Sequence, residues 1–114
     1  MIVLDILDRL EGKASVAAVV KFTCSVLEGR EIKSSEGTLG TAQTEIWQAS
    51  AATQIISLTL VNTHSSAVVI NVQKKPKNKE TLYNILPDDL SLGIGYMAVF
   101  GGQKLLISTT TGTL

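Results

Sequence analysis

His64, the only histidine of the chain, is followed directly by Ser65 and Ser66. A serine becomes a nucleophile only when a base is held against its hydroxyl group and a third group orients that base. Neighbouring residues on a polar tip between two apolar runs do not provide this orientation. A lone histidine also makes no zinc site without further strong ligands near it. The tip at residues 62–66 therefore predicts a turn between two strands of a hairpin, not an active site.

Two adjacent carboxylates, Asp88 and Asp89, follow Pro87. Catalysis by paired carboxylates requires a separation that only the fold can set. Calcium binding requires several oxygen ligands at spaced positions, and only two acids stand here. A turn at the end of a strand is the better interpretation.

The one run of like charge contains Lys74, Lys75, Lys77 and Lys79. Such a run can contact phosphates, but no aromatic residues are interleaved to stack on bases. We predict a solvated loop that also discourages aggregation at a sheet edge. If the run has a partner, an acidic protein surface and a nucleic acid both remain open.

The glycines and the cysteine carry no recognisable chemistry. Gly93 and Gly95, like the pair Gly101 and Gly102, lack the lysine and the following helix of a phosphate-binding loop. Cys24 is the only cysteine, which excludes an intramolecular disulfide and a cysteine-rich metal site. The sequence thus predicts a non-enzymatic protein with no cofactor and no metal.

Composition limits the class of protein further. The 114 residues fit one domain, and ten basic against ten acidic residues give a net charge of zero. Proteins that bind polyanions usually carry a basic excess, so nucleic acid is an unlikely partner. Only 18% of the residues are charged and 45% are hydrophobic, and such a charge-poor surface favours association. Asp5 and Asp8 interrupt the apolar segment at the amino end. We therefore expect this segment to be neither a signal peptide nor a membrane span. We expect the protein to be made in a cytoplasm.

Hydrophobic alternation with period two predicts an all-β fold. A long strand is expected at residues 14–27, a loop at 34–41, and nothing decides between helix and strand for residues 1–10. Further strands are expected at 30–33, 44–49, 54–62, 68–73, 81–86, 90–92, 96–100 and 104–109. This spacing is typical of an antiparallel β-sandwich, which we predict to be of jelly-roll type with roughly eight strands. Residues 39–114 would form its core, and residues 1–38 a strand and hairpin of the same sandwich or an arm between subunits.

From about Gly40 onward the order of motifs resembles a family of small virion structural proteins of tailed bacteriophages, of the decoration or head–tail accessory type. The matching positions are Leu39-Gly40-Thr41, Leu60-Val61-Asn62, Ile85-Leu86-Pro87 and Gly101-Gly102-Gln103-Lys104-Leu105. The resemblance covers about two-thirds of the chain. It implies a sandwich that decorates the capsid or joins neck or tail parts, usually as a trimer or higher ring, and without enzymatic residues. The protein would then be located in the virion, with itself and other virion proteins as partners.

The family usually has a last strand where this chain stops, which leads to a prediction about the amino end. Residues 2–8 are expected to pair as a strand beside residues 104–110, within the chain or in a neighbouring subunit. Trp47 and Tyr96 are expected to anchor an interface or to lie in the core. The candidate interface residues are Ile2, Leu4, Ile6, Trp47, Lys74, Lys75, Lys77, Lys79 and Tyr96. The rival hypothesis is a carbohydrate- or receptor-binding module, because β-sandwiches support both roles.

Overall fold

The computed structural model describes residues 2–101 and 104–109, and these residues form eleven β-strands and no helix. The predicted all-β class is confirmed, whereas roughly eight strands had been expected. The strands are β1 (Ile2–Leu4), β2 (Arg9–Ala14), β3 (Val20–Glu28), β4 (Glu31–Thr38), β5 (Thr44–Gln48), β6 (Thr53–Asn62), β7 (Val68–Lys75), β8 (Tyr83–Asn84), β9 (Leu90–Leu92), β10 (Tyr96–Gly101) and β11 (Lys104–Thr109).

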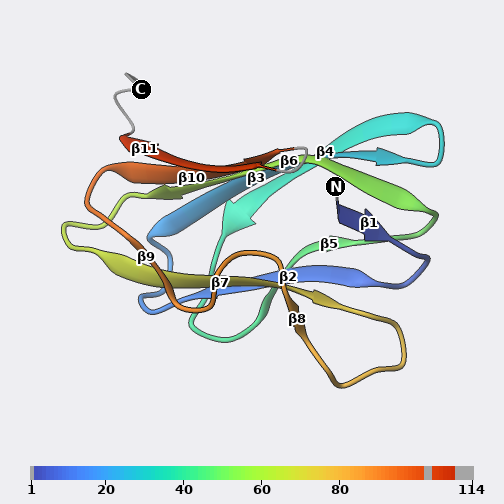
Figure 1. The fold of residues 1–114 in the computed structure, drawn as a ribbon, viewed down its shortest axis with the longest axis horizontal. Coiled ribbons are helices and arrows are strands. Elements are labelled where there is room, and N and C mark those ends of the chain that lie inside the picture. The colour runs from blue at the N-terminus through green and yellow to red at the C-terminus, as the bar shows by residue number, and fades with distance from the viewer. Residues whose placement is uncertain (1, 102–103, 110–114) are drawn as a thin grey trace.

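The strands form two antiparallel sheets that lie as two layers (Figure 1). Sheet A has the order β11-β10-β6-β3-β4, and β1 also pairs with β6. Sheet B has the order β5-β2-β7-β8, and β9 also pairs with β7. One cluster of buried side chains from both sheets fills the space between them, including Phe22, Leu58 and Leu60 of sheet A and Leu10, Ile70 and Val72 of sheet B.

Alternation of side chains explains the central strands. In β3 the side chains of Val20, Phe22, Cys24 and Val26 are buried, and the residues between them face away from the core. Strand β6 alternates in the same way on both sides of a bulge opposite Ser25 and Val26. These strands were predicted correctly because a half-buried strand produces this pattern.

Three predicted boundaries are wrong. The strand expected at residues 14–27 begins only at Val20, because Ala14 is the last residue of β2 and a turn with Ala18 at φ 63° precedes β3. Most of the loop expected at 34–41 belongs to β4, whose residues are largely exposed and therefore show no apolar alternation. Of the strand expected at 81–86, only Tyr83–Asn84 pairs with β7.

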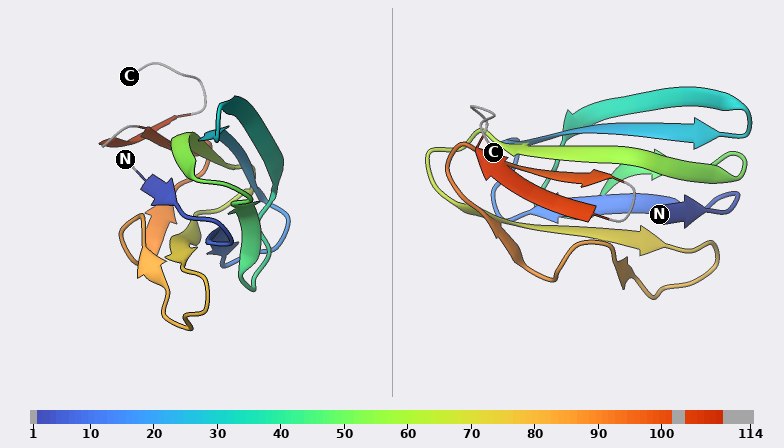
Figure 2. Two further views of the ribbon diagram at one scale, coloured as in Figure 1. Left: turned by 90° about the vertical axis from the view of Figure 1, so that its right-hand side faces the viewer. Right: turned by 45° about the horizontal axis from the view of Figure 1, so that its top comes forward.

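The predicted pairing of residues 2–8 with residues 104–110 is also wrong within the chain, whereas the alternative pairing with a neighbouring subunit stays a prediction, and residue 110 lies outside the described residues. Strand β1 pairs with the beginning of β6, with Ile2 opposite Ile55 and Leu4 opposite Thr53. Strand β10 pairs with β6 only from Ser57 onward. The earlier residues of β6 therefore have a free edge on that side, and β1 pairs with it. Residues 2–38 thus contribute to both sheets, with β2 between β5 and β7 in sheet B (Figure 2).

The polar tip between β6 and β7 is an arch between the sheets and not the predicted hairpin, because the two strands belong to different sheets. Asn62, 2% exposed, holds this arch together. Its side-chain amide nitrogen lies 2.9 Å from the carbonyl oxygen of Leu92 and 3.0 Å from those of Ser66 and Gly93. Its side-chain oxygen accepts a hydrogen bond of 2.8 Å from the backbone N–H of His64.

We expect Asn62→Ala to lower the free energy of unfolding by about 2–4 kcal/mol, because several buried polar groups lose their partner at once. Asn62→Asp keeps the shape but places a carboxylate against carbonyl oxygens, and it should cost at least as much. Urea unfolding of both variants measures this. A loss below about 0.5 kcal/mol, as for an ordinary surface residue, would contradict the role of Asn62.

Candidate functional site

The outer face of sheet A carries few charges at its centre. Residues directly opposite one another in antiparallel strands point to the same face of a sheet. The pairings therefore place one row across β4, β3, β6, β10 and β11, which consists of Glu36, Thr23, Thr59, Val99 and Leu106. None of these five side chains is buried, and Leu106 is 50% exposed.

Three more rows complete this face. They are Ser34-Ser25-Ser57-Gly101, Thr38-Lys21-Val61-Met97 and Ile32-Leu27-Gln54-Val3. Ile56, displaced by the bulge, adds a further exposed aliphatic side chain, and Ile32 is 77% exposed. Lys104 of β11 lies opposite Gly101 and extends the first of these three rows. The charged residues of the four rows are therefore Glu36, Lys21 and Lys104, and none of them belongs to β6 or β10. We call this set of four rows, together with Ile56, the neutral face.

The outer face of sheet B has the opposite character. Its strand β2 presents Arg9, Glu11 and Lys13 on the side away from the core, since Leu10, Gly12 and Ala14 point inward. Lys75 lies opposite Arg9, and Glu45 lies opposite Glu11. The charges that a soluble surface ordinarily carries on all sides are thus unequally divided between the two outer faces.

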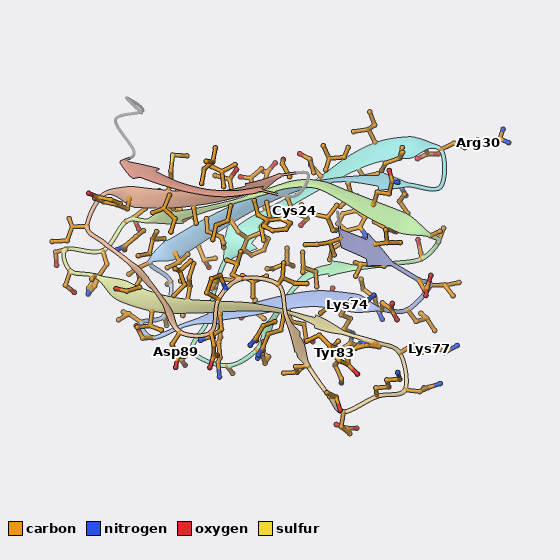
Figure 3. The ribbon with its side chains drawn as sticks, in the orientation of Figure 1. Cys24, Arg30, Lys74, Lys77, Tyr83 and Asp89 are labelled. Atoms are coloured by element: carbon orange, nitrogen blue, oxygen red, sulfur yellow. The ribbon has the colours of Figure 1, made fainter. Side chains whose placement is uncertain are left out.

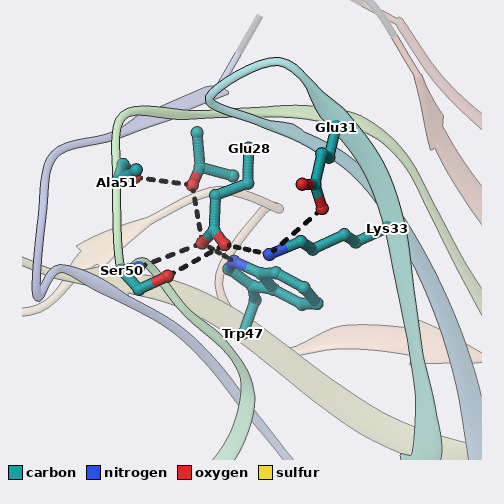
Figure 4. A network of polar contacts seen from close by, with 7 residues as sticks. Glu28, Glu31, Lys33, Trp47, Ser50 and Ala51 are labelled. Atoms are coloured by element: carbon teal, nitrogen blue, oxygen red, sulfur yellow. Dashed lines mark hydrogen bonds and ion pairs between the residues drawn. The ribbon is translucent and has the colours of Figure 1, made fainter.

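A buried carboxylate joins the two sheets at the end where β3 turns into β4. Glu28, with a 4% exposed side chain, accepts hydrogen bonds from Trp47 Nε1 at 3.2 Å and from the N–H and Oγ of Ser50 at 3.0 and 2.9 Å. Thr53 Oγ1 lies at 3.3 Å and Lys33 Nζ at 2.9 Å (Figure 4). Trp47 belongs to β5 of sheet B, so the cluster connects the sheets.

These donors determine the ionisation of Glu28. The hydrogen bonds from the Ser50 backbone and from Lys33 lower the pKa of the Glu28 carboxyl from 4.5 to about 2, against the effect of burial. The hydrogen bond from Lys33 to Glu28 also raises the pKa of the Lys33 ammonium group. A carboxylate whose acceptor sites are occupied and whose pKa is low is a poor proton donor near neutral pH. We interpret Glu28 as a structural group.

A second nearly buried carboxylate, Asp8, connects the β1–β2 turn to the loop after β7. It accepts hydrogen bonds from the backbone N–H of Lys77 at 2.8 Å and of Asp5 at 3.0 Å, and Lys74 Nζ lies 3.7 Å away. Burial raises the pKa of Asp8, but the two backbone hydrogen bonds and Lys74 outweigh it and the net shift is downward. Asp8 therefore stays ionised and fixes the two loops to each other.

The candidate interface residues differ in how far the structure exposes them. Ile2 and Leu4 are 8% and 0% exposed and pack in the core of the single chain, so their side chains are not available as a surface. Ile6, in the β1–β2 turn, is 55% exposed, and Tyr96, at the start of β10, is 41% exposed. Trp47 is half-buried and binds Glu28, so its indole N–H has a partner within the chain.

The four lysines of the charged run differ in their surroundings. Lys74 belongs to β7, lies near Asp8 and donates a hydrogen bond of 2.9 Å to the carbonyl oxygen of Val3. Lys75, Lys77 and Lys79 line a cavity, and the loop predicted for the lysine run begins only after Lys75, the last residue of β7, with a turn at residues 77–78. Figure 3 shows Lys74 and Lys77 toward the same end of the molecule.

The remaining chemically interesting side chains have structural surroundings. Among the described residues no hydrogen bond involves the His64 ring. Asp89 lies in a turn, as predicted, and exchanges two hydrogen bonds with Asn71, of 2.9 and 3.1 Å. Burial raises the pKa of the Cys24 thiol to about 11, which keeps it protonated.

Sequence reasoning missed Glu28 and Asp8 as organising residues and did not distinguish the two outer faces. No family model matches the sequence, and no curated protein or solved structure is significantly similar to it. In the part of the chain that the structure describes, no helix could span a membrane, and no group of three metal-binding side chains occurs.

Proposed function

We propose that this chain is a non-enzymatic assembly subunit that associates with copies of itself through the neutral face. The observation that carries the proposal is the contrast between the two outer faces. Sheet B exposes charges of both signs, whereas the centre of the neutral face presents serine, threonine and aliphatic side chains.

Physical reasons favour a second copy as the occupant of this face. Depletion of charged residues distinguishes the centre of a protein interface from the rest of a surface. Because the net charge is zero, copies do not repel one another over long distances. The central row places Thr23, Thr59 and Val99 side by side, so two such faces can pack with short side chains and exchange hydrogen bonds.

The setting that we propose is a tailed-bacteriophage virion, with a role in capsid decoration or as a neck or tail accessory. This setting rests on the resemblance of residues 39–114 to small virion structural proteins. The same resemblance implies a trimer as the favoured assembly and other virion proteins as additional partners. From the spacing of the strands we also propose that the sandwich is of the jelly-roll type. Self-association through the neutral face does not depend on that setting.

The rival role in carbohydrate or receptor binding has less support. Glycan sites usually use exposed aromatic platforms. The two exposed aromatic side chains among the described residues, Tyr83 and Tyr96, belong to different sheets. A positive signal on a glycan array would nevertheless favour the rival.

Oxidation of Met97 tests the proposed face, because Met97 lies in one of its four rows beside Val61. Methionine reacts with peroxide in proportion to its access to solvent. We expect the rate of sulfoxide formation at Met97, followed by mass spectrometry, to fall at least about three-fold between dilute and concentrated protein. A free methionine derivative in the same solution is the control for peroxide consumption. An unchanged rate at concentrations where the protein is oligomeric would place the interface elsewhere.

A further inference from the structure

We infer that the cavity between the β1–β2 turn and the loop after β7 is a docking site for an acidic, leucine-containing peptide segment of a partner protein. The cavity measures about 440 Å³ and lies on the sheet B side of the molecule, away from the neutral face. We call it the lysine cleft. It is lined by Leu7, Arg9, Gln48, Lys75, Pro76, Lys77, Asn78, Lys79 and Glu80.

The charges of the lysine cleft are unequally satisfied. Arg9 lies 3.8 Å from Glu11 and 3.7 Å from Glu45, so carboxylates of the same chain already balance its charge. Within the described residues no ion pair joins Lys75, Lys77 or Lys79 to a carboxylate. Three ammonium groups on one cleft therefore attract an anionic partner.

The walls of the cleft are held in place before any partner arrives. The Asp8 carboxylate binds the backbone of Lys77 in one wall and the backbone of Asp5 in the turn that forms the other. A hydrogen bond of 3.3 Å from Lys79 N–H to the Pro76 carbonyl closes the loop itself. Asn78, at φ 61°, occupies a position of this turn that asparagine tolerates well. Such preorganisation lowers the entropic cost of binding.

Leu7 is the feature that stability alone does not explain. It adopts φ 70°, a left-handed conformation that is unfavourable for leucine, and its side chain is 44% exposed while it lines the cleft. Glycine or asparagine would suit this turn position better. An exposed aliphatic side chain in a strained conformation points to a contact that the free chain lacks.

The combination of groups favours a peptide over a nucleic acid. Leu7 and Pro76 offer apolar contact, and Gln48 and Asn78 offer amide groups that can bind a peptide backbone. No aromatic side chain lines the cleft for base stacking, and Glu80 and the carboxylates around Arg9 would repel a continuous phosphate backbone. The zero net charge also provides no long-range attraction for a polyanion.

The test uses the full chain and a short fluorescent peptide in which glutamate and leucine alternate, with fluorescence anisotropy at low salt as the readout. We expect measurable binding, and we expect the double substitution Lys77→Gln and Lys79→Gln to weaken it at least about ten-fold. The double substitution Lys13→Gln and Arg30→Gln, which changes the net charge equally outside the cleft, should leave the affinity unchanged.

Leu7→Asn separates a binding role from a structural one. Relief of backbone strain should raise Tm by several degrees, roughly 4–8 °C for each kcal/mol, while loss of the apolar contact weakens peptide binding at least about three-fold. A purely structural role would leave the affinity unchanged.

Four results would overturn the inference. They are absence of peptide binding at low salt, equal binding of a peptide with glutamine in place of glutamate, tighter binding of single-stranded oligothymidine, and an equal loss in the Lys13→Gln, Arg30→Gln control. None of these results bears on association through the neutral face, so the two proposals succeed or fail separately.

Discussion

Replacement of Glu28 by alanine is expected to lower the free energy of unfolding by about 3–5 kcal/mol, a large share of the total for a domain of this size. The substitution removes the acceptor for Trp47 Nε1 and for both donors of Ser50, at the end of the two sheets where β3 turns into β4. Thr53 Oγ1 loses one of its two acceptors and keeps the carbonyl oxygen of Ala51 at 2.8 Å. Groups that lose their only buried partner cost more than the hydrogen bond itself contributes. Urea unfolding followed by tryptophan fluorescence measures the change. Glu31→Ala, which alters an exposed carboxylate 3.9 Å from Lys33, is the matched control and should have little effect.

The stability of the protein should also depend on pH through Glu28. The pKa in the folded chain, about 2, lies below the ordinary value of 4.5, so the ionised form favours the folded state. This contribution is complete above pH 4.5 and is lost as the pH falls toward 2. The lowered pKa of Asp8 acts in the same direction. The difference in stability between the wild-type chain and Glu28→Gln should therefore shrink as the pH falls through this window, and a constant difference would contradict the assignment.

Thr59→Arg is expected to separate the copies without unfolding them. Thr59 lies in β6 at the middle of the central row, between Thr23 and Val99. Two arginines brought together at the centre of a self-association interface cost several kcal/mol of binding free energy. The association constant should therefore fall at least about 100-fold. The fold should persist, because Thr59 is only half-buried and faces away from the core, where a substitution usually alters stability by less than about 0.5 kcal/mol. The mass from light scattering measures association, and Tm measures the stability of the fold.

Ser65→Arg serves as the control for Thr59→Arg, because it adds the same charge at the exposed tip of the arch between β6 and β7. It should leave the mass unchanged. If both variants dissociate, net charge and not the neutral face controls association, and the proposed interface is wrong.

The sequence predicted those strands whose two sides differ clearly. Val20, Phe22, Cys24 and Val26 alternate with polar residues, and β3 was recognised from them. Strand β2 also alternates, but two of its inward positions are Gly12 and Ala14, which give little hydrophobic signal. Gly12 is small for a physical reason, since a Cβ atom there would lie 3.1 Å from Leu39 and 3.2 Å from Ile46. The close packing of the core thus hides this strand from sequence analysis.

Less of the candidate site could be predicted from the sequence. The partners of Glu28 other than Lys33 lie 19 to 25 residues away, so no local motif marks the cluster. The neutral face was foreseen only as a general shortage of charge, because its rows exist only once the pairing of six strands is known. The turn at His64 was predicted, but its role as an arch was not, since local sequence does not state to which sheet the next strand belongs.

Light scattering coupled to size-exclusion chromatography, across protein concentrations from about 1 µM to about 100 µM, tests the central claim most directly. The account predicts that the wild-type chain reaches a multiple of its 12.1 kDa mass and that Thr59→Arg stays at that mass throughout. A wild-type chain that remains at 12.1 kDa at every concentration would contradict the account, and so would a Thr59→Arg variant that assembles as the wild type does.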